Sequence, residues 1–216
     1  RTRNMKIALF GATGNIGKII AQEALFRGHS VTGLVRHPER GVLTHPNFIL
    51  RQTNILETHL VTTEVTEHDV VVSAFAPEFS TPNTLSSAAA SLIQGLQAAQ
   101  VNRLLVVGGA GSLEVSPGLQ LMDSPQFPPD WRPLASAHGD ALKVYRQNDT
   151  LYWTYFSPAD RISPGSRTGA FRIGNDNRLL VDEQGNSIIS IEDFALALVN
   201  EIETPRFIRQ RVTVAY

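Results

Sequence analysis

The sequence predicts an α/β protein with a doubly wound parallel sheet, and three observations support this fold class. Apolar, strand-like runs alternate with helix-like stretches over the first three quarters of the chain, as in consecutive βαβ units. Two runs, Val70–Val72 and Leu104–Val107, are apolar throughout, which is typical of strands buried on both faces of a parallel sheet. A glycine-rich turn at Gly11–Gly17 joins the first strand-like run to the first helix-like stretch.

The individual elements follow from these patterns in chain order. We expect strands at Lys6–Phe10, Ser30–Val35, Phe48–Arg51, Asp69–Phe75, Arg103–Gly108 and Leu151–Ser157. We expect helices between them, at Asn15–Arg27, Leu56–Glu67, Asn83–Ala99 and Leu134–Gln147. In a sheet of this kind ligands bind beyond the carboxyl ends of the strands, so the residues that follow each strand are the candidates for function.

Two later segments depart from this alternation. Segment 116–133 contains five prolines, and this density excludes a regular helix or a central strand. Because it follows the fifth expected strand at the ligand end, it is either part of a substrate pocket or a plain insertion. Segment 159–216 contains short strands, a turn at Glu183–Asn186, and a helix that Ser190 caps with Asp193 in its first turn.

Length and composition predict one domain spanning residues 1–216, because this length is enough for one sizeable α/β core and too short for two. Residues 5–157 would form the core sheet with its helices, and residues 158–216 a small C-terminal extension over the ligand end. The absence of cysteine excludes disulfides, thiol nucleophiles and cysteine-bound metals. A net charge of −1 without a basic cluster gives no support for nucleic-acid or anionic-membrane partners.

The sequence contains no apolar run long enough to span a membrane and no signal-peptide pattern. We therefore expect a cytoplasmic protein with a small-molecule substrate, and the sequence leaves monomer and homodimer open. Five histidines have no paired metal-ligand spacing, namely His29, His37, His45, His59 and His68. No nucleophile elbow of the type G-x-S-x-G is present. No metal site and no triad chemistry are expected.

The glycine-rich turn Gly11–Gly17 has the flanks of a dinucleotide-binding loop, namely a buried strand before it and a helix start after it. Gly11 would let the chain turn sharply off the strand, and Gly14 would let bare backbone approach a pyrophosphate. Gly17 would let the helix pack closely on the strand. The N–H groups and partial positive charge of the helix N-terminus suit a phosphate. The alternative is a purely structural glycine-rich turn.

The end of the second expected strand favours NADP over NAD, with NAD as the alternative. This end lies about 20 residues after the glycines, where an acidic residue would hold the adenosine ribose of NAD. Arg36 stands there instead, and no acidic residue occurs before Glu39. The guanidinium of Arg36 could pair with a 2′-phosphate. The alternative is an ordinary solvated arginine.

Four stretches of the sequence resemble a known family. They are Gly-Ala-Thr-Gly-Asn-Ile-Gly (11–17), Asp-Val-Val-Val-Ser-Ala-Phe (69–75), Leu-Leu-Val-Val-Gly-Gly-Ala-Gly-Ser-Leu (104–113) and Ser-Ile-Ile-Ser-Ile-Glu-Asp-Phe-Ala (187–195). Together they are similar to the atypical short-chain dehydrogenase/reductases with a Rossmann-like fold. The subgroup is that of the NAD(P)H-binding proteins described as NADH-flavin reductases, which are relatives of biliverdin reductase B and NmrA-like proteins. The resemblance covers Met5 to Tyr216.

The resemblance implies cofactor contacts at residues that follow four of the expected strands. These residues are Thr13, Asn15 and Ile16 at the pyrophosphate, Asn54 and Ile55 at the adenine, Ala74, Phe75 and Ala76 at the nicotinamide ribose, and Gly109 with Ser112 near the nicotinamide and substrate. Asn54 stands where many relatives have aspartate, so its amide would replace a carboxylate in holding the adenine amino group.

The chain departs from the family pattern at the catalytic position. Short-chain dehydrogenases normally use Tyr-x-x-x-Lys for proton exchange, and no such pair exists here. Counting along the helix places His138 at the lysine position and Leu134 at the tyrosine position. We therefore expect His138, which would titrate near neutral pH, as a candidate proton donor. Ser112 would either hydrogen-bond a substrate carbonyl or cap a turn in its glycine-rich loop.

These features lead to two hypotheses from different classes. The first is an NADP(H)-dependent oxidoreductase that passes hydride to a flavin, a quinone or a similar small planar acceptor, for which water can supply the proton. The second is a non-catalytic NAD(P)H sensor whose long loop would bind a protein partner. Epimerase or dehydratase chemistry on a nucleotide sugar is disfavoured by the missing Tyr-Lys pair and the short C-terminal part.

Overall fold

The computed structural model describes residues 3–216 and confirms the α/β class. All six expected strands are present, as β1 (Lys6–Phe10), β2 (Ser30–Val35), β3 (Phe48–Gln52), β4 (Val70–Ser73), β5 (Arg103–Val107) and β8 (Tyr152–Ser157). The C-terminal segment adds β10 (Arg172–Gly174) and β12 (Gln210–Ala215) to the same sheet. The strand order is β10-β12-β8-β5-β4-β1-β2-β3, and every neighbouring pair is parallel except β10 with β12.

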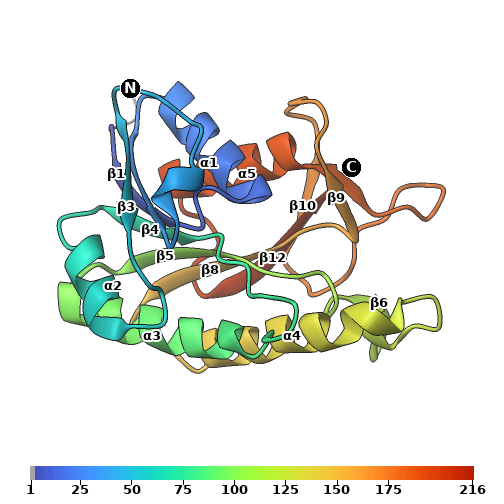
Figure 1. Cartoon of the computed structure of the whole chain (residues 1–216). Helices are drawn as coiled ribbons and strands as arrows, with labels where there is room; N and C mark the ends of the chain where they lie inside the picture. The colour runs from blue at the N-terminus through green and yellow to red at the C-terminus, as the bar shows by residue number, and fades with distance from the viewer. Residues whose placement is uncertain (1–2) are drawn as a thin grey trace.

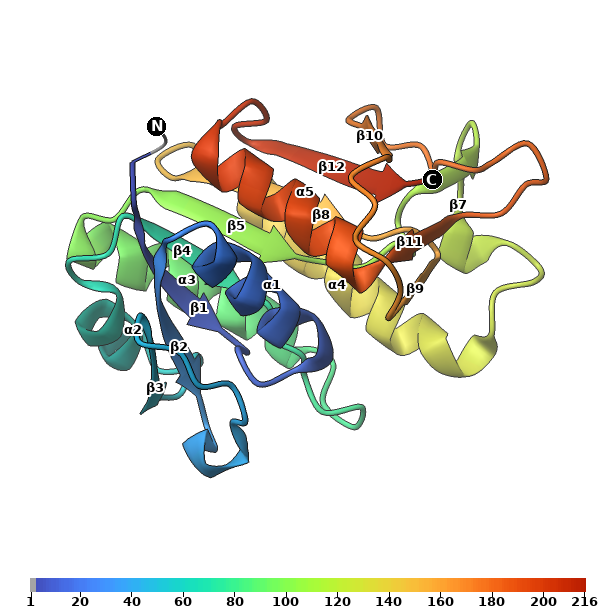
Figure 2. The same ribbon diagram turned by 90° about the horizontal axis from the view of Figure 1, so that it is seen from above.

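Helices cover both faces of this sheet, as expected for a doubly wound fold (Figures 1 and 2). They are α1 (Asn15–Phe26), α2 (Thr58–Val65), α3 (Thr84–Ala99), α4 (Arg132–Arg146) and α5 (Ile191–Glu203). Ile7 and Leu9 of β1 join the core layer against α1 and α5. Ala8 and Phe10, which alternate with them, join the layer against α2, α3 and α4. Alternate residues of one central strand thus contribute to two cores, which explains why β1 is apolar from Ile7 to Phe10.

The strands end earlier than the sequence predicts on the ligand side of the sheet. The expected strand Asp69–Phe75 ends at Ser73, and the expected strand Arg103–Gly108 ends at Val107. Apolar character continues past the last ladder pair, so hydropathy alone could not locate these ends. Residues 74–76 therefore leave the sheet at its carboxyl edge, where their backbone can contact a ligand.

Two helix starts show how local chemistry sets the ends of an element. The Ser190 hydroxyl accepts a hydrogen bond from the backbone N–H of Asp193 at 3.0 Å, which confirms the expected cap of α5. Helix α4 begins at Arg132, two residues before the expected start, with Pro133 in its first turn. Proline is tolerated there because the first N–H groups of a helix have no intrahelical partner.

The two irregular segments contain short elements. Segment 116–133 and the residues before it hold a small hairpin, β6 (Glu114–Ser116) with β7 (Leu119–Gln120), and two short 3₁₀ turns. In the C-terminal segment, β9 (Arg161–Ser163) pairs in parallel with β11 (Ile188–Ser190). This segment therefore completes one edge of the main sheet and supplies α5, in addition to the small sheet that follows β8. None of the helices within residues 3–216 is long and apolar enough to span a bilayer.

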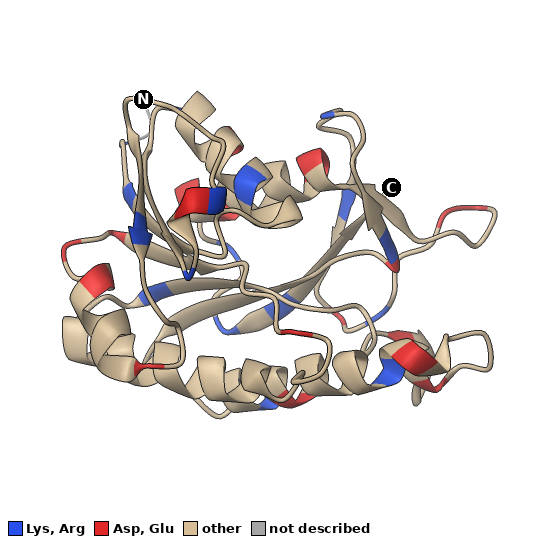
Figure 3. Ribbon diagram, viewed as in Figure 1, with Lys and Arg blue, Asp and Glu red and all other residues tan. Residues whose placement is uncertain are grey.

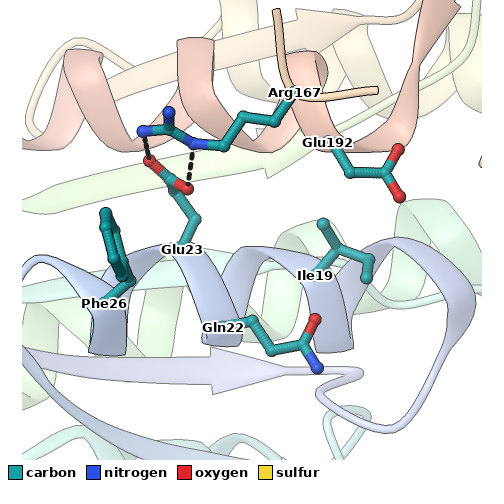
Figure 4. Close-up of a pocket in the computed structure, with 6 residues that line it drawn as sticks. All are labelled: Ile19, Gln22, Glu23, Phe26, Arg167 and Glu192. Atoms are coloured by element: carbon teal, nitrogen blue, oxygen red, sulfur yellow. Dashed lines mark hydrogen bonds and ion pairs between the residues drawn. The ribbon is translucent and has the colours of Figure 1, made fainter. Parts of the chain in front are cut away.

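Ion pairs tie the C-terminal end of α1 to two other elements. Arg27 pairs with Glu23 at 2.8 Å and with Glu203 of α5 at 2.9 Å. Arg167, from the segment before β10, donates two hydrogen bonds to the Glu23 carboxylate at 2.8 and 2.9 Å (Figure 4). Although burial raises the pKa of Glu23, the hydrogen bonds from both arginines hold it below its ordinary value. Acidic and basic residues are otherwise interspersed over the molecule (Figure 3).

Candidate functional site

The three glycines of the loop after β1 meet three different geometric requirements. Gly11 has a φ of +74°, and a Cβ there would lie 2.4 Å from the Ala74 carbonyl oxygen. A Cβ on Gly17 would lie 2.0 Å from the Gly11 carbonyl oxygen, so only glycine allows α1 to pack this closely. A Cβ on Gly14 would meet only the Gly11 carbonyl oxygen, at 3.4 Å. Gly14 therefore leaves open space in front of the N-terminus of α1, where a phosphate is best accommodated.

A cavity of about 450 Å³ begins at this loop and lies over the carboxyl ends of β1 to β4. It brings together most of the residues expected to contact the cofactor, namely Gly11, Thr13, Gly14, Arg36, Asn54, Ile55, Ala74, Phe75 and Ala76. Asn15, Ile16 and Gly17 form the first turn of α1 and do not line the cavity. The location agrees with the rule that ligands of doubly wound sheets bind beyond the strand ends.

Two arginines and a histidine gather where β2 ends. Arg36, His37 and Arg40 all line the cavity, the last from a short 3₁₀ turn at Pro38–Arg40. The guanidinium of Arg36 lies 3.6 Å from the carboxylate of Glu78, which reaches the same cavity from the loop after β4. Sequence reasoning missed Arg40, although its position four residues after Arg36 was a usable signal. It also missed Glu78, which only the tertiary structure brings to this place.

The next strand end contributes an unsatisfied polar group. Thr53 lines the cavity, and its buried hydroxyl has no hydrogen-bond partner among residues 3–216. Such groups are uncommon in folded proteins, and a ligand in the adjoining cavity could complete the hydrogen bond. No pattern in the sequence indicated this residue, because a threonine at a strand end is ordinary.

The Asn54 side chain takes part in the turn before α2. Its Oδ1 accepts the backbone N–H of Leu56 at 3.0 Å, and its Nδ2 donates to the Glu57 carboxylate at 3.1 Å. The side chain therefore stabilises this turn, as asparagine commonly does in loops. Each amide atom keeps the capacity for one further hydrogen bond, so the contact with the adenine amino group stays a prediction.

His138 lies beside Gly109 but does not have the expected titration behaviour. A Cβ on Gly109 would come within 3.0 Å of the His138 ring, so these two residues of the expected site are in contact. The ring also borders a small apolar space with Phe75 and Tyr155. Burial lowers the pKa of His138 to about 4. The imidazole is therefore neutral at physiological pH, and the expectation that it titrates near neutrality is wrong.

Ser112 is held in a different place from His138. Its hydroxyl accepts a hydrogen bond from Nη1 of Arg211 at 2.8 Å, and its carbonyl oxygen accepts one from Nη2 at 3.3 Å. It lines a polar cavity on another side of α4, whereas His138 faces the sheet. The structure therefore does not join the two expected catalytic residues in one site. Among residues 3–216, no group of three His, Asp or Glu side chains is placed to hold a metal ion.

Comparison with known proteins agrees with the geometry of the cavity. The family model described as NAD(P)H-binding matches residues 11–205. A protein of Burkholderia pseudomallei, provisionally described as exported, is 47% identical with a TM-score of 0.89, over 98% of this chain and 100% of that chain. A protein of Bacteroides thetaiotaomicron, provisionally described as an epimerase, is 38% identical with a TM-score of 0.92, over 99% of this chain and 98% of that chain.

A third solved structure, from Streptococcus pneumoniae, is provisionally described as an NADH-flavin reductase. It is 33% identical with a TM-score of 0.87, over 98% of this chain and 99% of that chain. The descriptions of these relatives differ in reaction and in location, but the family match covers the glycine loop and the elements from α1 to α5. This chain belongs to the NAD(P)H-binding family of Rossmann-like proteins, which confirms the resemblance seen in its sequence.

Proposed function

We propose that the protein is an NADP(H)-dependent oxidoreductase that passes hydride to a flavin, a quinone or a similar small planar acceptor. The observation that carries this proposal is the cavity at the strand ends, which links the glycine loop to the basic cluster after β2. The family match supports a nicotinamide cofactor, and the similar structure described as an NADH-flavin reductase supports oxidoreductase chemistry.

The residues that line the cavity fit a dinucleotide. The backbone at Gly11–Gly14 and the N-terminus of α1 would hold the pyrophosphate, because Gly14 places no side chain in front of the first N–H groups of α1, which have no intrahelical partner. Arg36 and Arg40 would bind the 2′-phosphate of the adenosine. Thr53 would gain the hydrogen bond that it lacks. When bound, the reduced nicotinamide supplies a hydride to the acceptor.

The surroundings of His138 favour an acceptor that does not depend on a strong protein acid. A neutral imidazole with a pKa of about 4 is a poor proton donor at physiological pH, and no Tyr-x-x-x-Lys pair is available. A carbonyl acceptor would need its proton in the transition state, whereas a reduced flavin or quinone can take one from water. Phe79 and Trp131, largely exposed and packed edge to face at 5.8 Å, lie on the two loops at this end and would suit a planar ring.

The proposal is tested by steady-state oxidation of NADPH and NADH against a panel of free flavins, quinones, aldehydes and ketones. We expect turnover with flavins or quinones, a preference for NADPH, and little or no turnover with simple carbonyls. The Gly14→Val variant is the matched control for turnover that does not require the cavity. Rates no higher than those of the control with every acceptor would contradict the proposal.

A second candidate is a non-catalytic NAD(P)H sensor that binds a protein partner. The separation of His138 from Ser112 favours it, because the chain then lacks an assembled proton-transfer pair. In that case NADPH should bind tightly without being oxidised by any acceptor. It should also protect segment 116–133 from proteolysis, because this segment would carry the response to the cofactor.

Three further predictions from the sequence belong with this proposal. We propose that residues 1–216 act as one domain, that the location is cytoplasmic, and that the substrate is a small molecule. Limited proteolysis tests the first, since one domain should give no stable fragment ending near residue 157. Cell fractionation tests the second.

A further inference from the structure

A second polar cavity, of about 210 Å³, lies beside α4 and under the β6–β7 hairpin, away from the cofactor cavity. Its side chains come from α4, from the loop after β5, from the loop after β10 and from β12. Those that matter below are Ser112, Glu114, Arg146, Asn177 and Arg211. At about 30 Å³ for each water in the liquid, the cavity could hold several waters or one small polar ligand.

Arg211 on β12 is buried, with 5% of its surface exposed, and it has only neutral partners. Its Nε donates to Asn177 Oδ1 at 3.1 Å, and its terminal nitrogens donate to hydroxyl and carbonyl oxygens of serine residues. The other well-buried arginines behave differently. Arg27 and Arg103 each pair with a carboxylate within 3.0 Å. Among residues 3–216, Arg211 has no such counter-ion, which is costly for a charge removed from water.

A second arginine, which is exposed to solvent, shares a partner with Arg211. Nη2 of Arg146 donates to Asn177 Oδ1 at 2.9 Å, so two guanidinium groups share one neutral oxygen. Burial and the positive charge of Arg146 lower the pKa of Arg211 to about 10, which still leaves it protonated at neutral pH. No carboxylate within residues 3–216 forms an ion pair with Arg146 either.

The acidic side chains of the cavity do not neutralise this pair. Asp140 is paired with Lys143 at 3.2 Å, and Glu114, whose negative charge partly offsets the lowering of the Arg211 pKa, forms no ion pair with either arginine. Asn177 has a left-handed backbone with φ of 67°, a conformation that asparagine and aspartate adopt more readily than other side chains. Aspartate would thus fit this position and could pair with both guanidinium groups, which would halve their combined positive charge, yet the chain has the uncharged amide. The positive charge is left available to a ligand.

We propose that this cavity is a binding site for a small oxyanion, a phosphate or a carboxylate, held between Arg146 and Arg211. The anion would supply the counter-ion that the protein lacks, and Arg146 would contribute the donors that its single hydrogen bond to Asn177 leaves free. The shared chemistry fits either free inorganic phosphate or the anionic group of a small metabolite. The proposal is independent of the reaction proposed above.

Titration calorimetry with inorganic phosphate tests this site, with chloride at equal ionic strength as the reference. Asn177→Asp should abolish phosphate binding while raising the melting temperature, because it supplies the counter-ion internally. Arg146→Met should weaken binding roughly ten- to a hundredfold, the range expected for hydrogen bonds to a charged group. Arg132→Met, which removes an exposed arginine of the same helix, is the matched control and should leave binding unchanged.

Inorganic phosphate could also bind the cofactor cavity, so Arg36→Ala is measured in parallel. Binding that is lost in Arg36→Ala and retained in Asn177→Asp would overturn the proposal, as would a wild type that binds neither inorganic phosphate nor glycerol 3-phosphate. Glycerol 3-phosphate and glycerol distinguish the two sources of the anion. Binding of the phosphate ester alone would identify a metabolite site, and binding of phosphate but not the ester would identify a free-ion site. NADPH affinity should be the same in Asn177→Asp and the wild type.

Discussion

Replacing Arg36 with alanine should weaken NADPH binding and leave NADH binding almost unchanged. Arg36 lines the cavity at the end of β2 and is more than half exposed, so its removal leaves no buried gap. A charge-assisted hydrogen bond to a 2′-phosphate contributes roughly 1.5–3 kcal/mol. At 1.4 kcal/mol for each factor of ten, the loss is about one to two orders of magnitude in affinity for NADPH.

Glu78 reduces the net contribution of Arg36, because the two side chains lie 3.6 Å apart before any cofactor arrives. An exposed ion pair of this kind is worth about 0–1 kcal/mol. Glu78→Gln should therefore tighten NADPH binding by up to about fivefold, and the effect should vanish in the Arg36→Ala background, where the pair no longer exists. Arg40→Ala provides a second test of the same cluster.

Fluorescence titration with NADPH and with NADH measures these effects. It compares the wild type with Arg36→Ala, with Glu78→Gln and with the double variant that combines these two changes. The result that would refute the reasoning is an equal loss of affinity for both cofactors in Arg36→Ala, or no loss for either. In that case Arg36 would be an ordinary surface residue, and the choice of NADP over NAD would fail with it. Salt should weaken NADPH binding to the wild type more than to Arg36→Ala.

Three other outcomes are expected. Gly14→Val should abolish NADPH binding in calorimetry with little change in melting temperature, because the side chain would enter the phosphate space and meet one neighbouring atom; retained affinity would disprove the loop assignment. Thr53→Val should weaken NADPH binding by roughly 0.5–1.5 kcal/mol without loss of stability, since the lost hydroxyl has no partner in the protein; a destabilised variant with normal affinity would argue against a cofactor contact. The pKa of His138 falls from 6.5 unfolded to about 4 folded, so the unfolded chain binds more protons between these values and stability should fall as pH falls from 6.5 to 4. Urea unfolding should show up to about 3 kcal/mol of this loss in the wild type and less in His138→Gln, with no activity limb from this residue between pH 6 and 8.

Strands β4 and β5 could be predicted because burial on both faces requires continuous apolar runs, and the other expected strands followed from the alternation of strand-like and helix-like segments. The Gly11–Gly17 loop was equally visible, since the strand before it and the helix after it lie in one short segment of the sequence. Arg36 and the residues after β3 and β4 could be placed at the cavity because parallel strands end at the same edge. The C-terminal strands were harder to assign, since β10 and β12 join the sheet edge only after the small sheet of β9 and β11.

The polar side chains could not be assigned by the same reasoning, because their environment depends on distant residues. The Ser112 hydroxyl is bound by Arg211, 99 residues later in the chain. The pKa of His138 depends on burial beside Gly109 and Tyr155, which the helical pattern of α4 does not reveal. The family resemblance places Asn54 at the adenine, and the sequence did not reveal that its amide also hydrogen-bonds Leu56 and Glu57.

The fixation of α1 has a consequence for the kinetics of cofactor association. The helix presents its N-terminus to the phosphate space, while the Glu23 carboxylate at its other end is held by Arg27 and Arg167, and Arg27 is held in turn by Glu203 of α5. The conformational entropy of placing this helix is therefore lost during folding and not when the cofactor arrives. Association should follow a single exponential whose rate rises linearly with cofactor concentration, without the plateau that a slow rearrangement of α1 would impose.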